Sequence, residues 1–152
     1  MDARETGPAA LPATRVADTT IAQPALAPTF LVIDDDPVQS MTMARVGGKA
    51  GYAVTTAATL ENAIAEIKQH PFDCITLDLL LGGQNGMVML GEIAKYSPGA
   101  MVIVVSGASP AVRESTLRIA TDLHLDSAEL PKPVNFSDLR LLLADRKAAC
   151  AS

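Results

Sequence analysis

The fold of this chain is decided by one stretch of sequence, Phe30-Leu31-Val32-Ile33-Asp34-Asp35-Asp36-Pro37. Four apolar residues stop abruptly at three aspartates, which is typical of a strand buried on both faces of a parallel sheet. Pro37 suits the first turn of a helix, because its fixed φ is helical and its missing N–H is not needed there. Asp36 stands directly before that helix, and we expect it to act as the N-cap.

The alternation of strand and helix continues along the rest of the chain. The predicted strands cover residues 30–33, 53–57, 73–78, 101–105 and 128–130. A predicted helix follows each strand, as apolar residues at helical spacing and glycine or proline stops indicate. The first helix is expected to carry Met41, Ala44 and Val46 and to end at Gly47-Gly48 or at Gly51. Five such pairs predict an α/β domain with a parallel sheet and helices on both faces.

The composition indicates one globular domain with an acidic surface. The chain has 152 residues, 49% of them hydrophobic, and 12 basic against 17 acidic side chains give a net charge of −5. This balance lacks the cationic excess that binds phosphate backbones, so we expect no direct nucleic-acid binding. The apolar runs are strand-sized and the N-terminus has no secretory signal, so we expect a cytoplasmic protein without membrane insertion.

Polar side chains stand where four of the five predicted strands end. Asp34 and Asp35 follow the first strand, Asp78 ends the third, Ser106 ends the fourth, and Lys132 lies just beyond the fifth. In open parallel sheets the functional crevice lies beyond the carboxyl ends of the strands. We therefore expect these five side chains to converge at one edge of the sheet.

The chemistry of this set points to phosphoryl transfer. Three neighbouring carboxylates repel one another and raise their pKa values unless a cation compensates them, and Mg²⁺ suits such an oxygen-rich site. Asp78 is the predicted carboxylate nucleophile, which forms an aspartyl phosphate while Asp34 and Asp35 share Mg²⁺ with it. Lys132 and Ser106 are predicted to neutralise the phosphoryl oxygens.

Each of these residues also has a purely structural interpretation. Acidic residues after a strand often cap helices, and a single lysine is commonly a solvated surface group. Asp78 is harder to explain in this way, because it interrupts two apolar triplets, where an unpaired charge is costly. Lys132 lies between two prolines, which restrict its backbone.

Together these segments resemble the receiver domain of two-component response regulators, in the CheY-like superfamily. The resemblance covers residues 29–146 and rests on 30–37, on 72–78 with Gly86 eight residues after Asp78, on 104–107 and on 130–133. It implies a flavodoxin-like, doubly wound sheet of five strands in the order 2-1-3-4-5. It also implies that a histidine kinase or a histidine phosphotransfer protein donates the phosphoryl group.

The resemblance assigns a role to each site residue. Asp78 becomes the phosphoacceptor, and Asp34 and Asp35 become the acidic pair. The backbone carbonyl of Leu80 becomes a further metal ligand. Ser106 takes the switch position, and Lys132 becomes the phosphate-binding lysine, which often precedes a cis peptide bond.

The sequence departs from the receiver pattern at several positions, among them Pro131 beside the lysine and Val134 where phenylalanine is common. Gly82 stands where receivers usually have proline, and Glu129 stands where many have the aromatic residue that moves on phosphorylation. We therefore expect the signal to pass through Ser106 and residues 107–110. Leu80 is apolar where some receivers position the hydrolytic water, so we expect slow autodephosphorylation and no enzyme activity beyond self-phosphorylation. Aspartyl-phosphate phosphatases generally carry a second aspartate at the position of Leu80, which argues against that class.

The predicted organisation is a flexible Ala/Pro-rich leader (1–28), a receiver domain (29–146) and a short tail (147–152). This leaves no room for an output domain, so we expect a stand-alone receiver that works by phosphorylation-dependent protein binding or by phosphate relay. The expected partner face comprises residues 110–123, 128–130 and 136–146. The alternative is a pseudo-receiver that acts as a scaffold without phosphorylation.

Overall fold

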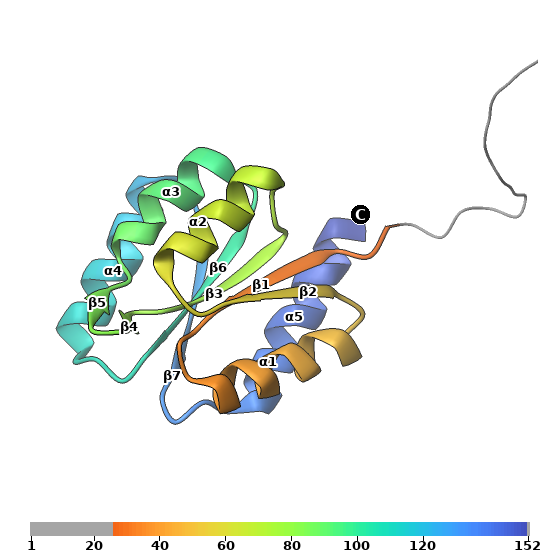
Figure 1. Cartoon of the computed structure of the whole chain (residues 1–152), viewed down its shortest axis with the longest axis horizontal. Coiled ribbons are helices and arrows are strands. Elements are labelled where there is room, and N and C mark those ends of the chain that lie inside the picture. Colours follow the sequence, from red (N-terminus) through yellow and green to blue (C-terminus); the bar gives the residue numbers. More distant parts are fainter. Residues whose placement is uncertain (1–25, 152) are drawn as a thin grey trace, which may run out of the picture.

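Five parallel strands form one sheet in the order β2-β1-β3-β6-β7 (Figure 1). They are β1 (Thr29–Ile33), β2 (Ala53–Ala57), β3 (Cys74–Asp78), β6 (Met101–Ser106) and β7 (Asp126–Pro131). Counted within this sheet alone, the order is 2-1-3-4-5, which confirms the predicted flavodoxin-like topology. The computed structural model describes residues 26–151, so the predicted leader lies outside the described residues except for positions 26–28.

Helices cover both faces of the sheet (Figure 1). They are α1 (Pro37–Lys49), α2 (Leu60–Gln69), α3 (Val88–Tyr96), α4 (Pro110–Asp122) and α5 (Phe136–Ala151). α1 and α5 lie on one face, and α2, α3 and α4 lie on the other, as right-handed crossovers on both sides of a central strand require. α5 continues beyond residue 146, so the expected tail is largely part of the last helix.

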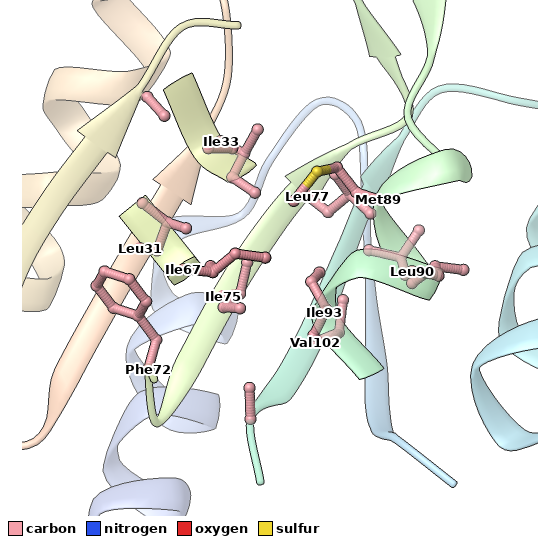
Figure 2. Packing of buried hydrophobic residues seen from close by; sticks show 14 of the residues in the cluster. Leu31, Ile33, Ile67, Phe72, Ile75, Leu77, Met89, Leu90, Ile93 and Val102 are labelled. Atoms are coloured by element: carbon pink, nitrogen blue, oxygen red, sulfur yellow. The ribbon is translucent and has the colours of Figure 1, made fainter. Parts of the chain in front are cut away.

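The core consists of two apolar layers separated by the sheet. Successive residues of β1 alternate between them, with Leu31 and Ile33 in the layer under α2–α4 and Phe30 and Val32 in the layer under α1 and α5. All four are fully buried, as the continuous apolar run predicted. Figure 2 shows the first layer, in which side chains of β1 and β3 meet those of α3. Each buried aliphatic side chain contributes roughly 1.5–3 kcal/mol.

α1 ends just before Gly51, the second of the two predicted ends. The helix does not stop at Gly47-Gly48 but runs to Lys49, and Gly51 with φ +93° follows it. Gly47 is part of the contact surface, since a Cβ there would lie 2.4 Å from a ring carbon of Phe30. The buried positions include Met43 and Gly47, one turn apart, whereas Met41 is 55% exposed. The glycine thus allows close packing of the helix on the sheet.

The segment between β3 and α3, whose glycines indicate a loop, forms a β-hairpin. β4 (Leu80–Leu81) pairs antiparallel with β5 (Gln84–Asn85). The two turn residues, Gly82 and Gly83, have φ values of +57° and +80°. Positive φ at both central positions is what a two-residue type I′ turn needs, and glycine provides it without strain. The hairpin lies at the carboxyl edge of the main sheet (Figure 1).

Candidate functional site

Three carboxylates meet at the carboxyl edge of the sheet. Oxygen atoms of Asp34, Asp35 and Asp78 all lie within 4.8 Å of one another. β1 and β3 are adjacent and in register, with Ile33 opposite Leu77, so the residues that follow in each strand come together. Asp34 and Asp78 are buried at 3% exposure, whereas Asp35 is exposed. The predicted convergence of the acidic residues is therefore found in the structure.

Asp34 is held from the backbone and from α1. Its Oδ1 accepts a hydrogen bond from the Asp36 backbone N at 2.8 Å, and its Oδ2 accepts one from Gln39 Nε2. Burial nevertheless raises the pKa of Asp34, and the nearby charge of Asp78 adds to the increase, although the hydrogen bonds and Lys132 oppose it. The buried Asp34 carboxylate is thus only partly compensated by its hydrogen bonds and by Lys132, and a divalent cation bound to this carboxylate would stabilise its charged form.

Asp78 faces the predicted lysine. Lys132 Nζ lies 3.1 Å from Asp78 Oδ2, and the backbone N of Leu80 donates to Oδ1 at 3.0 Å. The backbone N of Lys132 donates to the Ser106 carbonyl at 3.1 Å, which fixes the end of β7 against β6. The Lys132–Pro133 peptide bond is cis, as the resemblance implied. The ends of β3 and β7, which lie on either side of β6, therefore bring the lysine to the carboxylate.

Ser106 lies in the same cavity as Asp78 and Lys132. The cavity has a volume of about 550 Å³, and the Ser106 side chain is buried. Its Oγ accepts a hydrogen bond from the Ala108 backbone N at 2.8 Å, which leaves the hydroxyl proton available for another acceptor. The remaining wall is largely apolar and includes Leu80 and Val112. The cavity thus combines a polar floor with an apolar rim.

The structure also shows site contacts that sequence reasoning missed. Gln39 lies in the first turns of α1, and nothing in the sequence distinguishes it from a solvated helix residue. The backbone N of Gly82 donates to Asp35 Oδ2 at 2.9 Å, a contact whose only sequence signal is the Gly-Gly pair. The predicted capping role of Asp36 is confirmed, since its Oδ1 accepts from the backbone N of Val38 and of Gln39.

Glu129 makes a different contact from that of an aromatic switch residue. Its Oε1 lies 3.4 Å from Arg113 Nε, and Arg113 Nη1 donates to the carbonyl of Ala108 at 2.7 Å. Ala108 in turn donates to Ser106. Polar contacts therefore connect the site serine with α4 and with the central part of β7.

The fold and this site define the class of the protein. A doubly wound five-stranded sheet carries an acidic trio and a facing lysine at its carboxyl edge. The chain belongs to the response regulator receiver domain family, which matches residues 30–144. The resemblance inferred from the sequence is confirmed.

Relatives of known sequence and structure agree with this assignment. The chain is 27% identical over 107 residues to the transcriptional regulatory protein BaeR of Escherichia coli, covering 70% of this chain and 45% of that protein. It is 34% identical over 77 residues to the chemotaxis protein CheY of Thermotoga maritima, covering 50% of this chain and 64% of that protein. The chain spans less than half the length of the first curated relatives that it matches.

Solved structures with the same fold include two response regulators. One, from Burkholderia pseudomallei, has a phosphorylated aspartic acid, a calcium ion and citrate. Its sequence is 30% identical to this chain, the TM-score is 0.66, and the match covers 82% of this chain and 71% of that one. The other is a CheY-like receiver domain from Methanospirillum hungatei with 24% identity and a TM-score of 0.68, covering 82% and 99%. Among residues 26–151, no helix is both long and apolar enough to cross a bilayer.

Replacement of Asp34 by asparagine tests the charge balance of the site. Folding raises the pKa of Asp34 above 3.8, mainly through burial, so ionisation of this group opposes folding of the metal-free protein. This cost is absent below the ordinary pKa and develops as the pH rises through the raised pKa. We expect Asp34→Asn to increase the free energy of unfolding at neutral pH without Mg²⁺, and the gain to vanish toward pH 3.8.

Urea denaturation across this pH range in the presence of a chelator measures the effect. Asp122→Asn is the matched control, because Asp122 is an exposed residue of α4. A gain that is independent of pH, or equal in the control, would contradict the electrostatic explanation.

Proposed function

We propose that Asp78 accepts a phosphoryl group from a histidine kinase or a histidine phosphotransfer protein in a Mg²⁺-dependent reaction. The domain then signals by phosphorylation-dependent protein binding or passes the phosphoryl group on. The observation that carries this proposal is the buried Asp78 carboxylate, which lies between Lys132 and the acidic pair. The phosphorylated aspartic acid in the Burkholderia pseudomallei response regulator supports it.

The chemistry that we propose begins with attack by an oxygen of Asp78 on the phosphorus of a phosphohistidine. The new P–O bond forms as the P–N bond breaks, and the electron pair of that bond leaves with the imidazole nitrogen. Lys132 Nζ already contacts Asp78 Oδ2 and is placed to neutralise a phosphoryl oxygen. Ser106 retains a free hydroxyl proton and can donate it to another of these oxygens.

The residues present fit a divalent cation. Asp34, Asp35 and Asp78 would hold Mg²⁺, and the carbonyl of Leu80 is the further ligand that the family resemblance implies. When bound, the ion supplies positive charge to the oxygens of the transferring phosphoryl group. Burial raises the pKa of Asp34, and a bound cation would favour the charged form of this carboxylate. The calcium ion in the Burkholderia pseudomallei structure supports a divalent site.

Incubation with acetyl phosphate and Mg²⁺, followed by intact-mass measurement, tests this proposal. We expect the mass gain of one phosphoryl group, and we expect a chelator to suppress it. A protein that folds and binds Mg²⁺ but never gains this mass would contradict phosphorylation. That result would favour the alternative, a scaffold that works without a phosphoryl group.

Phosphorylated Asp78 is expected to hydrolyse slowly. The Leu80 side chain lies at the rim of the cavity and offers no group to orient an attacking water. Asn85 also lines the cavity, but its Oδ1 already accepts from the Met87 backbone N at 2.9 Å. We expect a lifetime of minutes or longer, shortened several-fold in Leu80→Asn. The decay of phosphoprotein after removal of acetyl phosphate measures it, and a wild-type lifetime of seconds would contradict the prediction.

The contacts around Arg113 support an output route without an aromatic switch. If Ser106 turns toward a phosphoryl oxygen, its contact with the Ala108 N–H changes, and Arg113 links Ala108 to Glu129. We expect a beryllofluoride mimic to shift amide NMR signals of residues 107–131 as well as those near Asp78. Shifts confined to the Asp78 pocket would sink this route.

The partner surface that we propose consists of α4, β7 and α5. Three large apolar side chains of α4 and its C-terminus are 36–42% exposed, namely Val112, Ile119 and Leu123. Apolar side chains left in solvent are suited to contact with another protein. This face adjoins the Arg113–Glu129 pair, so a change at the pair can reach the partner. We place the protein in the cytoplasm, where kinase-driven phosphorylation requires it.

A further inference from the structure

The β4–β5 hairpin is hydrogen-bonded to two of the three acidic side chains. Gly82 N donates to Asp35 Oδ2 at 2.9 Å, and Leu80 N donates to Asp78 Oδ1 at 3.0 Å. Asp35 and Gly82 are 47 positions apart in sequence, so this contact joins the end of β1 to the hairpin turn. Asp35 is the exposed member of the trio. Without a partner, an exposed carboxylate samples several rotamers.

We propose that Gly82 is a positioning residue for the divalent cation: its backbone N–H holds one oxygen of Asp35, and so keeps the carboxylate in the acidic trio. This inference rests on the metal site of the proposed function. Preorganised ligands bind more tightly because the cost of ordering them is already met in the free protein. The hairpin turn thereby contributes to cation affinity without contacting the ion.

The backbone conformation of Gly82 explains why this residue can donate a hydrogen bond to Asp35. Its φ of +57° lies in the left-handed region, which glycine adopts freely and asparagine adopts more readily than other residues. Proline has φ near −65° and no N–H, so it can neither form this turn nor donate to Asp35. Proline is the residue that receivers usually have at this position. The contact is thus a property of this chain and depends on its departure from the common pattern.

The coupling must act in both directions. If the hairpin contact strengthens cation binding, then cation binding stabilises the hairpin contact by the same factor. The hairpin also contacts the phosphoacceptor, since the backbone N of Leu80 donates a hydrogen bond to Asp78 Oδ1. The hairpin therefore becomes more ordered when the cation is bound. Leu80, Gly83 and Asn85 of this hairpin also line the cavity beside Asp78.

A Mg²⁺ titration of wild type, Gly82→Pro and Gly82→Asn, followed by amide NMR shifts, tests the proposal. Gly82→Asn keeps the N–H and tolerates the positive φ, so we expect an affinity within about twofold of wild type. Gly82→Pro lacks the donor, and we expect about tenfold weaker binding, equivalent to about 1.4 kcal/mol. Gly83→Ala disturbs the neighbouring turn position but retains the Gly82 donor. Its Mg²⁺ affinity should therefore be close to that of Gly82→Asn.

Amide hydrogen exchange keeps the test decisive if Gly82→Pro does not fold. Without metal, Asp35→Ala removes the acceptor, and we expect faster exchange at residues 80–85 than in wild type. Mg²⁺ should slow exchange there in wild type only. Equal Mg²⁺ affinity in the proline and asparagine variants, or unchanged exchange in Asp35→Ala, would overturn the role of Gly82 and leave the phosphoacceptor function standing. Absence of Mg²⁺ binding by wild type would instead overturn the metal site itself.

Discussion

Asp78→Ala is expected to abolish the phosphoryl mass gain that acetyl phosphate and Mg²⁺ produce in the wild-type chain. The variant loses the attacking oxygen, and with it the group that Lys132 and Leu80 N hold in place. Rate losses on removal of a covalent nucleophile are very large, so the signal should fall to background. Intact-mass measurement over a time course with both proteins provides the comparison.

Two controls make this result specific. Asp122→Ala removes an exposed carboxylate of α4 and should be phosphorylated as rapidly as wild type. Lys132→Ala keeps the nucleophile but loses the ammonium group that faces Asp78. This variant should therefore be phosphorylated more slowly than wild type, but still measurably. If Asp78→Ala still gained the phosphoryl mass at the wild-type rate, another side chain would be the acceptor.

Gly86→Ala is expected to damage both stability and phosphorylation. A Cβ at this buried glycine would lie 2.5 Å from the Asp78 carbonyl oxygen and 3.1 Å from the Leu79 Cα, both backbone atoms. Neither atom can move without displacing the end of β3, which carries the phosphoacceptor. Overpacking of this kind typically costs about 1–3 kcal/mol. Urea denaturation measures that cost, and the acetyl phosphate time course measures the accompanying loss of rate.

Gly91→Ala is the matched control for this substitution. Gly91 lies in α3, and nothing lies within 4 Å of the Cβ that alanine would add. Alanine favours the helix interior over glycine by about 1 kcal/mol, so this variant should be more stable than wild type. Two glycine-to-alanine changes five positions apart are thus expected to have opposite signs. Equal stability of the two variants would show that the backbone contact at Gly86 does not constrain the loop.

Much of the fold could be predicted because burial on both faces leaves a clear pattern. The apolar run of β1 ends at Asp34, and the run of β3 ends at Asp78, so the strand ends could be located from sequence. Predicting that these ends meet needed only the general rule that parallel strands share an edge. The shortest predicted strand, residues 128–130, proved longer, because β7 pairs with β6 along the whole of Asp126–Pro131.

The local features that the sequence left open have a common physical cause. A glycine within a helix and a glycine that ends one look alike in sequence, and only the contact with Phe30 shows that Gly47 belongs inside α1. Similarly, Gly82 and Gly83 indicated a loop, whereas the pairing of Leu80 with Asn85 makes that loop a hairpin. In each case the deciding interaction is made by a partner that local pattern does not reveal.

The sequence by itself determined the class of the protein and predicted which side chains meet at the carboxyl edge of its sheet. Asp34, Asp35, Asp78, Ser106 and Lys132 could be named in advance, because polar groups at the ends of several buried strands of one parallel sheet share an edge. The tertiary structure decided how these groups are held: Gln39 against Asp34, Gly82 against Asp35, and Arg113 between Ala108 and Glu129. These contacts depend on the distances and directions of hydrogen bonds between distant segments, which only the packed chain defines.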